Sequence, residues 1–418
     1  MPHTTATPRR ERRKATVLGA VLAAGAVLAA GPTAQALGST THPTTAASKP
    51  QASTASTARA LTPAVRAQLD RAITRILHRT RTPGVTVGLT VPGKGTYTRA
   101  FGTAQKNTRT PMRPGFNMRV GSLTKTFTAT AVLQLADQKK VSLDDPISRY
   151  VRGVPQGRHI TLRHLMEMRS GLFEYMADED WIKAFVADPH RQWTADEMLS
   201  YAFRHPAQAA PGSTFQYVNT NYLLLGKVVE KVSGQSLSRY LDQHILTPSH
   251  LRNTFYPKGA EFPAPHAHGY TDQTSNGSVA DATHWNPSDG GAAGVMISNL
   301  GDLQRWAPML AKGTLLKHGT QAQRMKMLPT GMPDVGYGLG VFNNHGWIGH
   351  NGSLPGYQSL MVYLPAAKAT LIVHTTSDIR HQGQSLSTLF GKAITNIVTP
   401  KNVFDIQPPK PDSAAQRH

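Results

Sequence analysis

The order of strand-like and helix-like segments restricts the folds open to this chain. Near the start, Thr62-Pro63 opens an amphipathic helix, and two alternating apolar runs follow at 85–91 and 96–101, with a turn between them. Strand-like runs return near the end, at 337–342, 347–350, 361–364 and 370–374, before a closing helix. The segment between is mostly helical in pattern. This order predicts an α/β (α+β) domain in which an antiparallel sheet, assembled from both ends of the chain and flanked by helices, carries an inserted all-helical subdomain.

The first 36 residues have the pattern of a secretory signal peptide. A basic cluster at 9–14 precedes an uncharged run at 15–31, and Ala34-Gln35-Ala36 has the form of a cleavage site. A membrane anchor is the alternative, but a run of this length rich in Ala and Gly is a poor spanning helix, and no other run approaches about 18 apolar residues. We therefore expect a secreted, extracellular protein without a stable membrane span.

The remaining boundaries follow from composition. Residues 37–59 are Thr, Ser, Ala and Pro with almost no bulky apolar side chain, which predicts a disordered linker. The apolar periodicity of a folded domain covers 60–405, with the helical subdomain at about 140–290, and 406–418 has the composition of a tail.

The chain has no cysteine and a formal charge of +21. An exported domain without disulfides must be held by its core, which a chain of this length can supply. The five basic groups and one acid of residues 1–36 account for only four of the charges, so the mature protein stays strongly basic. The sequence has no basic run with interleaved aromatic residues of the kind that would indicate nucleic-acid binding. Anionic cell-wall polymers are a possible partner, a generally solvated basic surface is the alternative, and we expect a monomer.

The stretch 120–127 contains the only S-x-x-K sequence, formed by Ser122 and Lys125. A serine three residues before a lysine at the head of a helix shares a helical face with it, so the hydroxyl can meet the amine. Leu123, Phe127 and two further apolar residues at intervals of four would bury the opposite side. Taken alone, the pattern also fits a serine cap beside a solvated lysine.

Two later motifs favour a catalytic reading. Tyr217 and Asn219 form the only Y-x-N sequence, and residues two apart in an extended loop project to the same side. His350 begins one of two H-x-G sequences and lies between two strand-like runs, whereas His381 begins the other in a polar stretch. Each motif alone also fits a structural role: a packed tyrosine, an asparagine helix cap, a turn histidine.

Other chemistries have weaker support in the sequence. Lys317-His318-Gly319 resembles K-T-G, but a polar helix-like run follows it where that motif requires a strand. The chain has no G-x-S-x-G. His266 and His268 could suggest a metal pair, yet no acidic or cysteine partner lies at ligand spacing, so we expect no metal and no cofactor.

Together, the S-x-x-K, Y-x-N and H-x-G motifs, in this order and at these separations, resemble the signature of the penicillin-recognising serine hydrolases. The similarity is greatest to secreted actinobacterial D-alanyl-D-alanine carboxypeptidases and class C β-lactamases. It extends over about 61–398 and includes the connecting segments 160–172, 211–251, 293–298 and 337–340. The resemblance implies the β-lactamase/transpeptidase-like fold and a serine hydrolase that works through an acyl-enzyme.

The resemblance also implies residue roles. Ser122 would be the nucleophile, and Lys125 would assist its deprotonation directly or through Tyr217, which leaves the identity of the base open. Asn219 would hold the acyl side of the substrate, and His350 would shuttle a proton to the leaving group. The oxyanion would be bound by the backbone N–H groups of Ser122 and Ser353. In relatives the segments of Trp181 and Trp285 line the cleft; Trp285, beside a glycine-rich stretch, is the stronger candidate for a substrate contact.

One departure from the carboxypeptidase pattern affects the substrate. Those relatives bind a terminal carboxylate with an arginine on the strand after Y-G-x-G, and here that strand, 341–345, has none, although His345 could substitute. The first hypothesis is a D-alanyl-D-alanine carboxypeptidase acting on peptidoglycan-type peptides. The alternatives are a D-stereospecific amidase or peptidase, an esterase or a β-lactamase of the same fold, and a slow-turnover, wall-binding β-lactam sensor.

Overall fold

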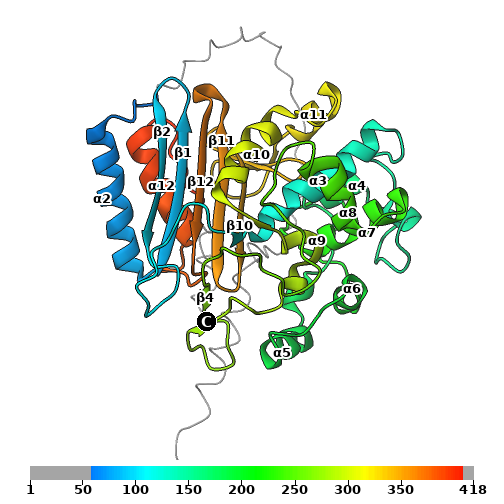
Figure 1. Ribbon diagram of the computed structural model, residues 1–418. Helices are drawn as coiled ribbons and strands as arrows, with labels where there is room; N and C mark the ends of the chain where they lie inside the picture. Colours follow the sequence, from blue (N-terminus) through cyan, green and yellow to red (C-terminus); the bar gives the residue numbers. More distant parts are fainter. Residues whose placement is uncertain (1–57, 408–418) are drawn as a thin grey trace, which may run out of the picture.

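A computed structural model describes residues 58–407 of the chain (Figure 1). The predicted signal peptide, almost all of the predicted linker and the tail beyond Gln407 lie outside the described residues. The centre of the fold is an eight-stranded sheet in the order β2-β1-β12-β11-β10-β9-β8-β7. Its strands are β1 (Gly84–Val91), β2 (Gly95–Gly102), β7 (Leu328–Pro329), β8 (Val335–Tyr337), β9 (Phe342–Asn344), β10 (Trp347–Leu354), β11 (Tyr357–Leu364) and β12 (Ala369–Thr375).

The sheet is assembled from both ends of the chain, as the sequence predicts. β1 pairs with β12 along its whole length, from Val85 opposite Thr375 to Thr90 opposite Thr370, and every pairing in the sheet is antiparallel. β11 and β12 are buried along their whole length, because helices cover both faces of the sheet.

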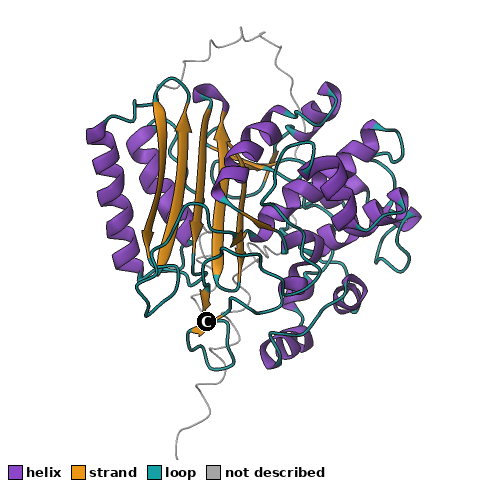
Figure 2. Cartoon of the chain, viewed as in Figure 1, coloured by secondary structure: helices purple, strands orange, loops and turns teal. Residues whose placement is uncertain are grey.

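Helices from the two ends of the chain pack together on one face of the sheet (Figure 2). They are α2 (Pro63–Thr80) and α12 (Leu386–Val398). α2 begins as predicted: the side chain of Thr62 accepts a hydrogen bond from the backbone of Val65, and a proline occupies the first helical position. α10 (Leu300–Lys312) covers the other face, and α3 (Thr124–Asp137) lies beside it, with Phe127 stacked on Trp306 at 4.6 Å between ring centroids.

The inserted subdomain packs against α3 on the side away from α2 (Figure 1). α7 (Thr220–Ser233) is its most buried helix, and it ends at Gly234. The surrounding segments are η3 (Ile147–Arg149), α4 (Leu162–Met166), η4 (Tyr175–Ala177), α5 (Glu179–Ala187), α6 (Ala195–Phe203), α8 (Leu237–Leu241) and η5 (Asp242–Leu246). The segment 261–294 contains only short elements: β4 (Tyr270–Thr271) paired with β5 (Ala280–Asp281), then η6 (Pro287–Gly290) and α9 (Gly291–Gly294). The remaining short elements are β3 (Met118–Arg119) paired with β6 (Ile297–Ser298), α11 (His318–Arg324) and η7 (Pro365–Ala367).

One local prediction was wrong. The single strand expected at 337–342 is divided into β8 and β9, because the chain turns between them and Gly340 adopts φ +77°. A Cβ at Gly340 would lie 2.5 Å from the Cβ of Ala129 in α3, so both the backbone angle and the contact require glycine. The N-cap of α10 is Asn299, whose side chain accepts a hydrogen bond of 2.9 Å from the backbone of Asp302.

The surface of residues 58–407 exposes few large apolar side chains. Val279, in the loop between β4 and β5, is the only exposed large hydrophobic residue in this part of the chain. None of the helices described is long and apolar enough to cross a membrane.

Candidate active site

Ser122 and Lys125 meet as the sequence predicts, although Ser122 precedes the α-helix. It lies in a 3₁₀ turn, η2 (Gly121–Leu123), and α3 begins at Thr124. The Nζ atom of Lys125 donates a hydrogen bond of 2.9 Å to Ser122 Oγ. Lys125 is completely buried, so the alternative of a solvated lysine beside a serine cap is wrong.

Three acceptors surround the Lys125 amine. Besides Ser122 Oγ, they are Asn219 Oδ1 at 2.7 Å and the carbonyl oxygen of Ala293 at 3.0 Å. Burial lowers the pKa of Lys125 to about 7, against the opposing effect of the Glu174 carboxylate. A substantial fraction of neutral amine near pH 7 is what a proton acceptor for Ser122 requires.

Tyr217 and Asn219 approach the same amine from the loop before α7. Asn219 occupies the N-cap position of α7, yet its side chain makes no capping hydrogen bond and binds Lys125 instead. The ring of Tyr217 lies 4.9 Å from Lys125 Nζ. Burial raises the pKa of Tyr217 well above its usual value, and a hydrogen bond with Ser122 partly offsets this effect. The phenol is therefore protonated in the free protein, and Lys125 is the better placed base.

Glu174 belongs to the site although the sequence reasoning missed it. Its carboxylate accepts hydrogen bonds from the backbone N–H groups of Asn219 and Met176. Burial raises its pKa to about 7, against the lowering effects of these hydrogen bonds and of Lys125. Its position three residues after Gly171, just beyond a segment recognised in the sequence, was the signal that could have found it.

His350 lies inside β10, where it pairs with Met361 of β11, and not in a turn. Its Nδ1 is hydrogen-bonded to the backbone oxygen of Asn351, so Nδ1 must donate; Nε2 then accepts from the hydroxyl of Tyr337 at 3.0 Å. Burial, with a smaller contribution from Lys125, lowers the pKa of His350 to about 3. The imidazole is therefore neutral, and its ring lies 6.1 Å from that of Tyr217.

β10 also brings Ser353 against Ser122. A Cβ on Gly121 would lie 2.7 Å from the backbone nitrogen of Ser353, and one on Gly352 would lie 2.0 Å from the carbonyl oxygen of Val120. Only glycines allow the strand and the turn to approach this closely. Because β9 pairs with β10 only as far as Gly349, the end of β10 that carries Ser353 is free of that neighbour. The two backbone N–H groups expected to bind an oxyanion thus come from adjacent segments.

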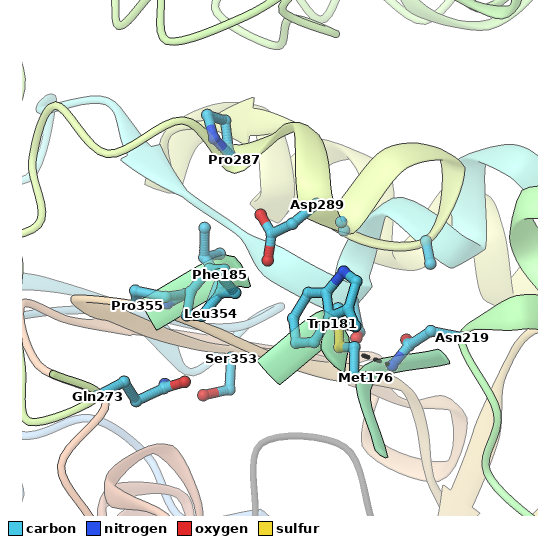
Figure 3. Close-up of a pocket in the computed structure, with 14 residues that line it drawn as sticks. Met176, Trp181, Phe185, Asn219, Gln273, Pro287, Asp289, Ser353, Leu354 and Pro355 are labelled. Atoms are coloured by element: carbon cyan, nitrogen blue, oxygen red, sulfur yellow. Dashed lines mark hydrogen bonds between the residues drawn. The ribbon is translucent and has the colours of Figure 1, made fainter. Parts of the chain in front are cut away.

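Ser122 is one of the residues that line a cleft of about 570 Å³, which is open to solvent. Figure 3 shows other side chains of this cleft. Its apolar wall includes Met176, Trp181 and Phe185, and the two aromatic rings are stacked with centroids 5.1 Å apart. Asp289 faces the same space with only 6% of its surface exposed. Burial raises the pKa of Asp289 to about 7, and two backbone N–H groups and Arg119 oppose this effect. The other lining residues are Asn219, Gln273, Pro287, Gly290, Ala293, Gly294, Ser353, Leu354 and Pro355.

A protein-family model described as Beta-lactamase matches residues 69–389. The chain belongs to the β-lactamase family. Protein flp of Staphylococcus aureus (strain MW2) is 26% identical over 320 residues, which cover 73% of this chain but only 62% of flp. A solved D-stereospecific amidohydrolase from Streptomyces sp. is 30% identical, with a TM-score of 0.68 over 75% of this chain and 94% of that one. A D-amino acid amidase from Ochrobactrum anthropi SV3, complexed with D-phenylalanine, is 28% identical, with a TM-score of 0.70 over 79% and 98% of the two chains.

The fold and the hydrolase class expected from the sequence are thereby confirmed for this β-lactamase-family protein. Trp285, predicted as a substrate contact, is not among the residues that line the cleft; its ring is edge-on to that of Phe185, with centroids 6.2 Å apart. Trp181 lines the cleft itself. Asp289 went unnoticed, although it is the only acid between Asp281 and Asp302 and directly precedes the glycine pair that leads into α9.

The other candidate groups of this β-lactamase-family chain lie elsewhere or form no metal site. His345 is in the turn before β10, about 20 Å along the strand from Ser353, and its ring is 3.8 Å from the Asp334 carboxylate. It cannot replace the missing arginine. His268 is hydrogen-bonded to Asp281 at 2.7 Å, and within residues 58–407 no group of three or more potential ligands could hold a metal ion. A helix, α11, follows Lys317, as predicted.

Proposed function

We propose that this protein is a D-stereospecific amidohydrolase that cleaves the amide or ester bond at the carbonyl carbon of an N-terminal D-amino acid with an apolar side chain. The supporting observation is the composition of the cleft: a wall formed by Trp181, Phe185 and Met176, with a buried carboxylate, Asp289, facing the same space. Aromatic rings suit an apolar side chain, and the carboxylate suits the free ammonium group. The D-configuration is supported only by the relatives described above.

The reaction begins with Lys125 as the neutral amine. Ser122 Oγ bonds to the substrate carbonyl carbon while its proton passes to Lys125 Nζ, 2.9 Å away, and the backbone N–H groups of Ser122 and Ser353 bind the oxyanion. Collapse breaks the bond to the leaving nitrogen, which takes the proton from Lys125, directly or through the Tyr217 phenol. Water then adds to the acyl carbon, gives a proton to the lysine, and releases Ser122 with that proton restored.

A D-alanyl-D-alanine carboxypeptidase is less well supported. The cationic side chain hydrogen-bonded to Ser122 is the buried Lys125, and none of the described residues that line the cleft is a lysine or an arginine. A terminal carboxylate would share the cleft with Asp289, a group of the same charge. This function, first expected from the sequence, stays a prediction and is tested with the same assay.

The test compares hydrolysis of D-phenylalanine amide, L-phenylalanine amide, N-acetyl-D-phenylalanine amide and a diacyl-L-lysyl-D-alanyl-D-alanine peptide. We expect the D-amide to be the best substrate and Ser122→Ala to abolish its hydrolysis. Asp289→Asn, which keeps the shape but removes the charge, should lower kcat/KM for the free D-amide about 10- to 100-fold and leave the N-acetylated amide within about threefold. Faster hydrolysis of the peptide than of the amide would overturn the proposal in favour of the carboxypeptidase.

We also propose that the protein acts outside the cell, because residues 1–36 have the pattern of a secretory signal peptide. Cell fractionation of the producing organism, with detection of a chain that begins near residue 37, tests this. A chain retained in the cytoplasm with Met1 intact would contradict it.

A further inference from the structure

The positive charge of the molecule is concentrated in one part of the chain. Residues 58–136 contain 13 lysines and arginines and a single acid, Asp70, whereas residues 137–300 contain 15 basic and 17 acidic side chains. The segments that form the active-site cleft belong mainly to the second, nearly neutral part. Residues 301–407 add nine basic and four acidic side chains, so most of the excess charge lies on α2, the β1–β2 turn, β2 and the loop that follows, apart from the buried Arg119 and Lys125.

The exposed members of this group from α2 onward define what we call the basic face: Arg71, Arg75, Arg79, Arg81, Lys94, Arg99, Lys106, Arg109 and Arg113. Three of them, Arg71, Arg75 and Arg79, recur every four residues on the outward side of α2, so they form a row with steps of about 6 Å along the helix axis. The opposite side of α2, with Leu69 and Ile73, is buried against the sheet and α12.

Little of this charge is neutralised within the molecule. In the described part of the chain, the one ion pair formed by the basic face joins Arg99 to Asp70 at 3.5 Å, and the hydroxyl of Tyr97 donates to the same carboxylate. The three arginines of the row form no ion pair with any described residue. The backbone of α2 is already ordered before any partner binds. The three uncompensated arginines can therefore contact a partner together, without a further loss of backbone entropy.

We propose that the basic face binds a linear polyanion carrying repeated phosphate groups. α2 lies on the other side of the sheet from α5 and α9 (Figure 1), whose residues line the cleft, so a polymer bound to the row leaves the cleft open. A soluble polymer fits better than a membrane, because the only exposed large hydrophobic side chain among residues 58–407, Val279, is in the β4–β5 loop and the basic face offers no apolar anchor. The contact would localise the hydrolase on an anionic matrix. It does not depend on which acyl substrate the cleft accepts.

The test measures binding of the full chain to immobilised long-chain inorganic polyphosphate at several salt concentrations. The row variant is Arg71→Ser/Arg75→Ser/Arg79→Ser. The matched control, Arg152→Ser/Arg158→Ser/Arg239→Ser, removes the same charge from exposed positions of the helical subdomain that form no ion pair with described residues. We expect the row variant to bind about 10- to 100-fold more weakly, with a flatter dependence of log K on log salt, and the control to stay within about threefold of the wild type.

If both variants bound polyphosphate equally weakly, the proposal would be overturned, because the net charge of the protein and not the arginine row would then cause the binding. Failure of the wild type to bind polyphosphate at 150 mM salt, about physiological ionic strength, would overturn it as well. A parallel arm uses vesicles of phosphatidylglycerol and phosphatidylcholine; binding to these vesicles without binding to polyphosphate would replace the polymer with a membrane surface. Thermal unfolding of both variants checks that each is folded, independently of hydrolytic activity.

Discussion

At the scale of single residues, the charge of Lys125 decides whether Ser122 can react. The amine is enclosed by protein, and only a neutral amine can accept the serine proton. Glu174 acts on it from behind Asn219: its negative charge favours the ammonium form and so raises the lysine pKa, while burial lowers it to about 7. The two groups therefore titrate as a coupled pair near pH 7.

We expect the rate of acylation of Ser122 to rise with pH between about 6 and 8 and then to level off, because the lysine pKa lies near 7. Glu174→Gln should move the midpoint to lower pH, since it removes the charge that raises the lysine pKa. The measurement is the burst rate with a chromogenic β-lactam or ester across this range. A midpoint that moves to higher pH in the variant, or a rate independent of pH, would contradict the assignment of Lys125 as the base.

At the scale of elements, the site depends on how closely the strands approach α3. The turn between β8 and β9 presses Gly340 against Ala129, one helical turn beyond Lys125, and the hydroxyl of Tyr222 in α7 lies close to the same point. β10 meets the turn before α3 in the same way, through Gly352. The position of the catalytic lysine is thus fixed from the sheet side by backbone contacts and not by side-chain packing alone.

Gly340→Ala should lower the free energy of unfolding by about 2–5 kcal/mol, because it combines a strained φ with a contact against backbone-anchored atoms. Gly346→Ala is the matched control: Gly346 also has positive φ, but the nearest atoms there belong to the side-chain ends of Leu364 and Asn402. It should cost only about 1–2 kcal/mol. Urea denaturation of both variants makes the comparison, and equal losses would show that the contact with α3 carries no cost.

At the scale of the whole molecule, buried ionisable groups oppose each other as pH changes. Burial raises the pKa values of Glu174 and Asp289 to about 7 and that of Asp378 to about 6, so these acids contribute stability at low pH that is lost as pH rises through those values. Burial lowers the pKa values of His350 and His374 to about 3, so the histidines contribute stability above about 6.5 that is lost as pH falls toward 3. The two sets of groups therefore give opposing slopes of stability against pH between about 3 and 7.

His374 allows the loss of stability at low pH that buried histidines cause to be measured separately. It is fully buried in β12, and neither ring nitrogen has a hydrogen-bond partner among the described residues. His374→Leu removes the group that must stay neutral in the fold. Its advantage over the wild type should therefore grow by up to about 1.4 kcal/mol per pH unit as pH falls from 6.5 toward 3. Chemical denaturation at pH 7, 5 and 4 measures this slope, and a difference that does not vary with pH would refute it.

What the sequence predicted, and what it did not, follows from the range of the interactions involved. The three motifs located Ser122, Lys125, Tyr217, Asn219 and His350 because each was read against a known pattern, and the structure brings all five together. The Thr62 cap of α2 follows from local chemistry. Asp289 and Glu174 were missed because a carboxylate acquires its role only from burial by segments distant in sequence. The division of β8 from β9 depends on Ala129, about two hundred residues away, and no local pattern contains that contact.

The pairing of β1 with β12 has a consequence for how the chain could be cut and rejoined. The segment before α2 meets the end of α12, since the backbone N–H of Arg59 donates a hydrogen bond of 2.8 Å to the carbonyl oxygen of Val398. The two ends of the described domain therefore lie close together, beside the sheet. In a circular permutant, a short peptide would join these two ends, and new termini would be placed in an exposed loop of the helical subdomain. The pairing of β1 with β12 would then join segments that are close in sequence. Because loop closure limits the rate at which such sheets form, this circular permutant should fold faster than the natural order of the same residues.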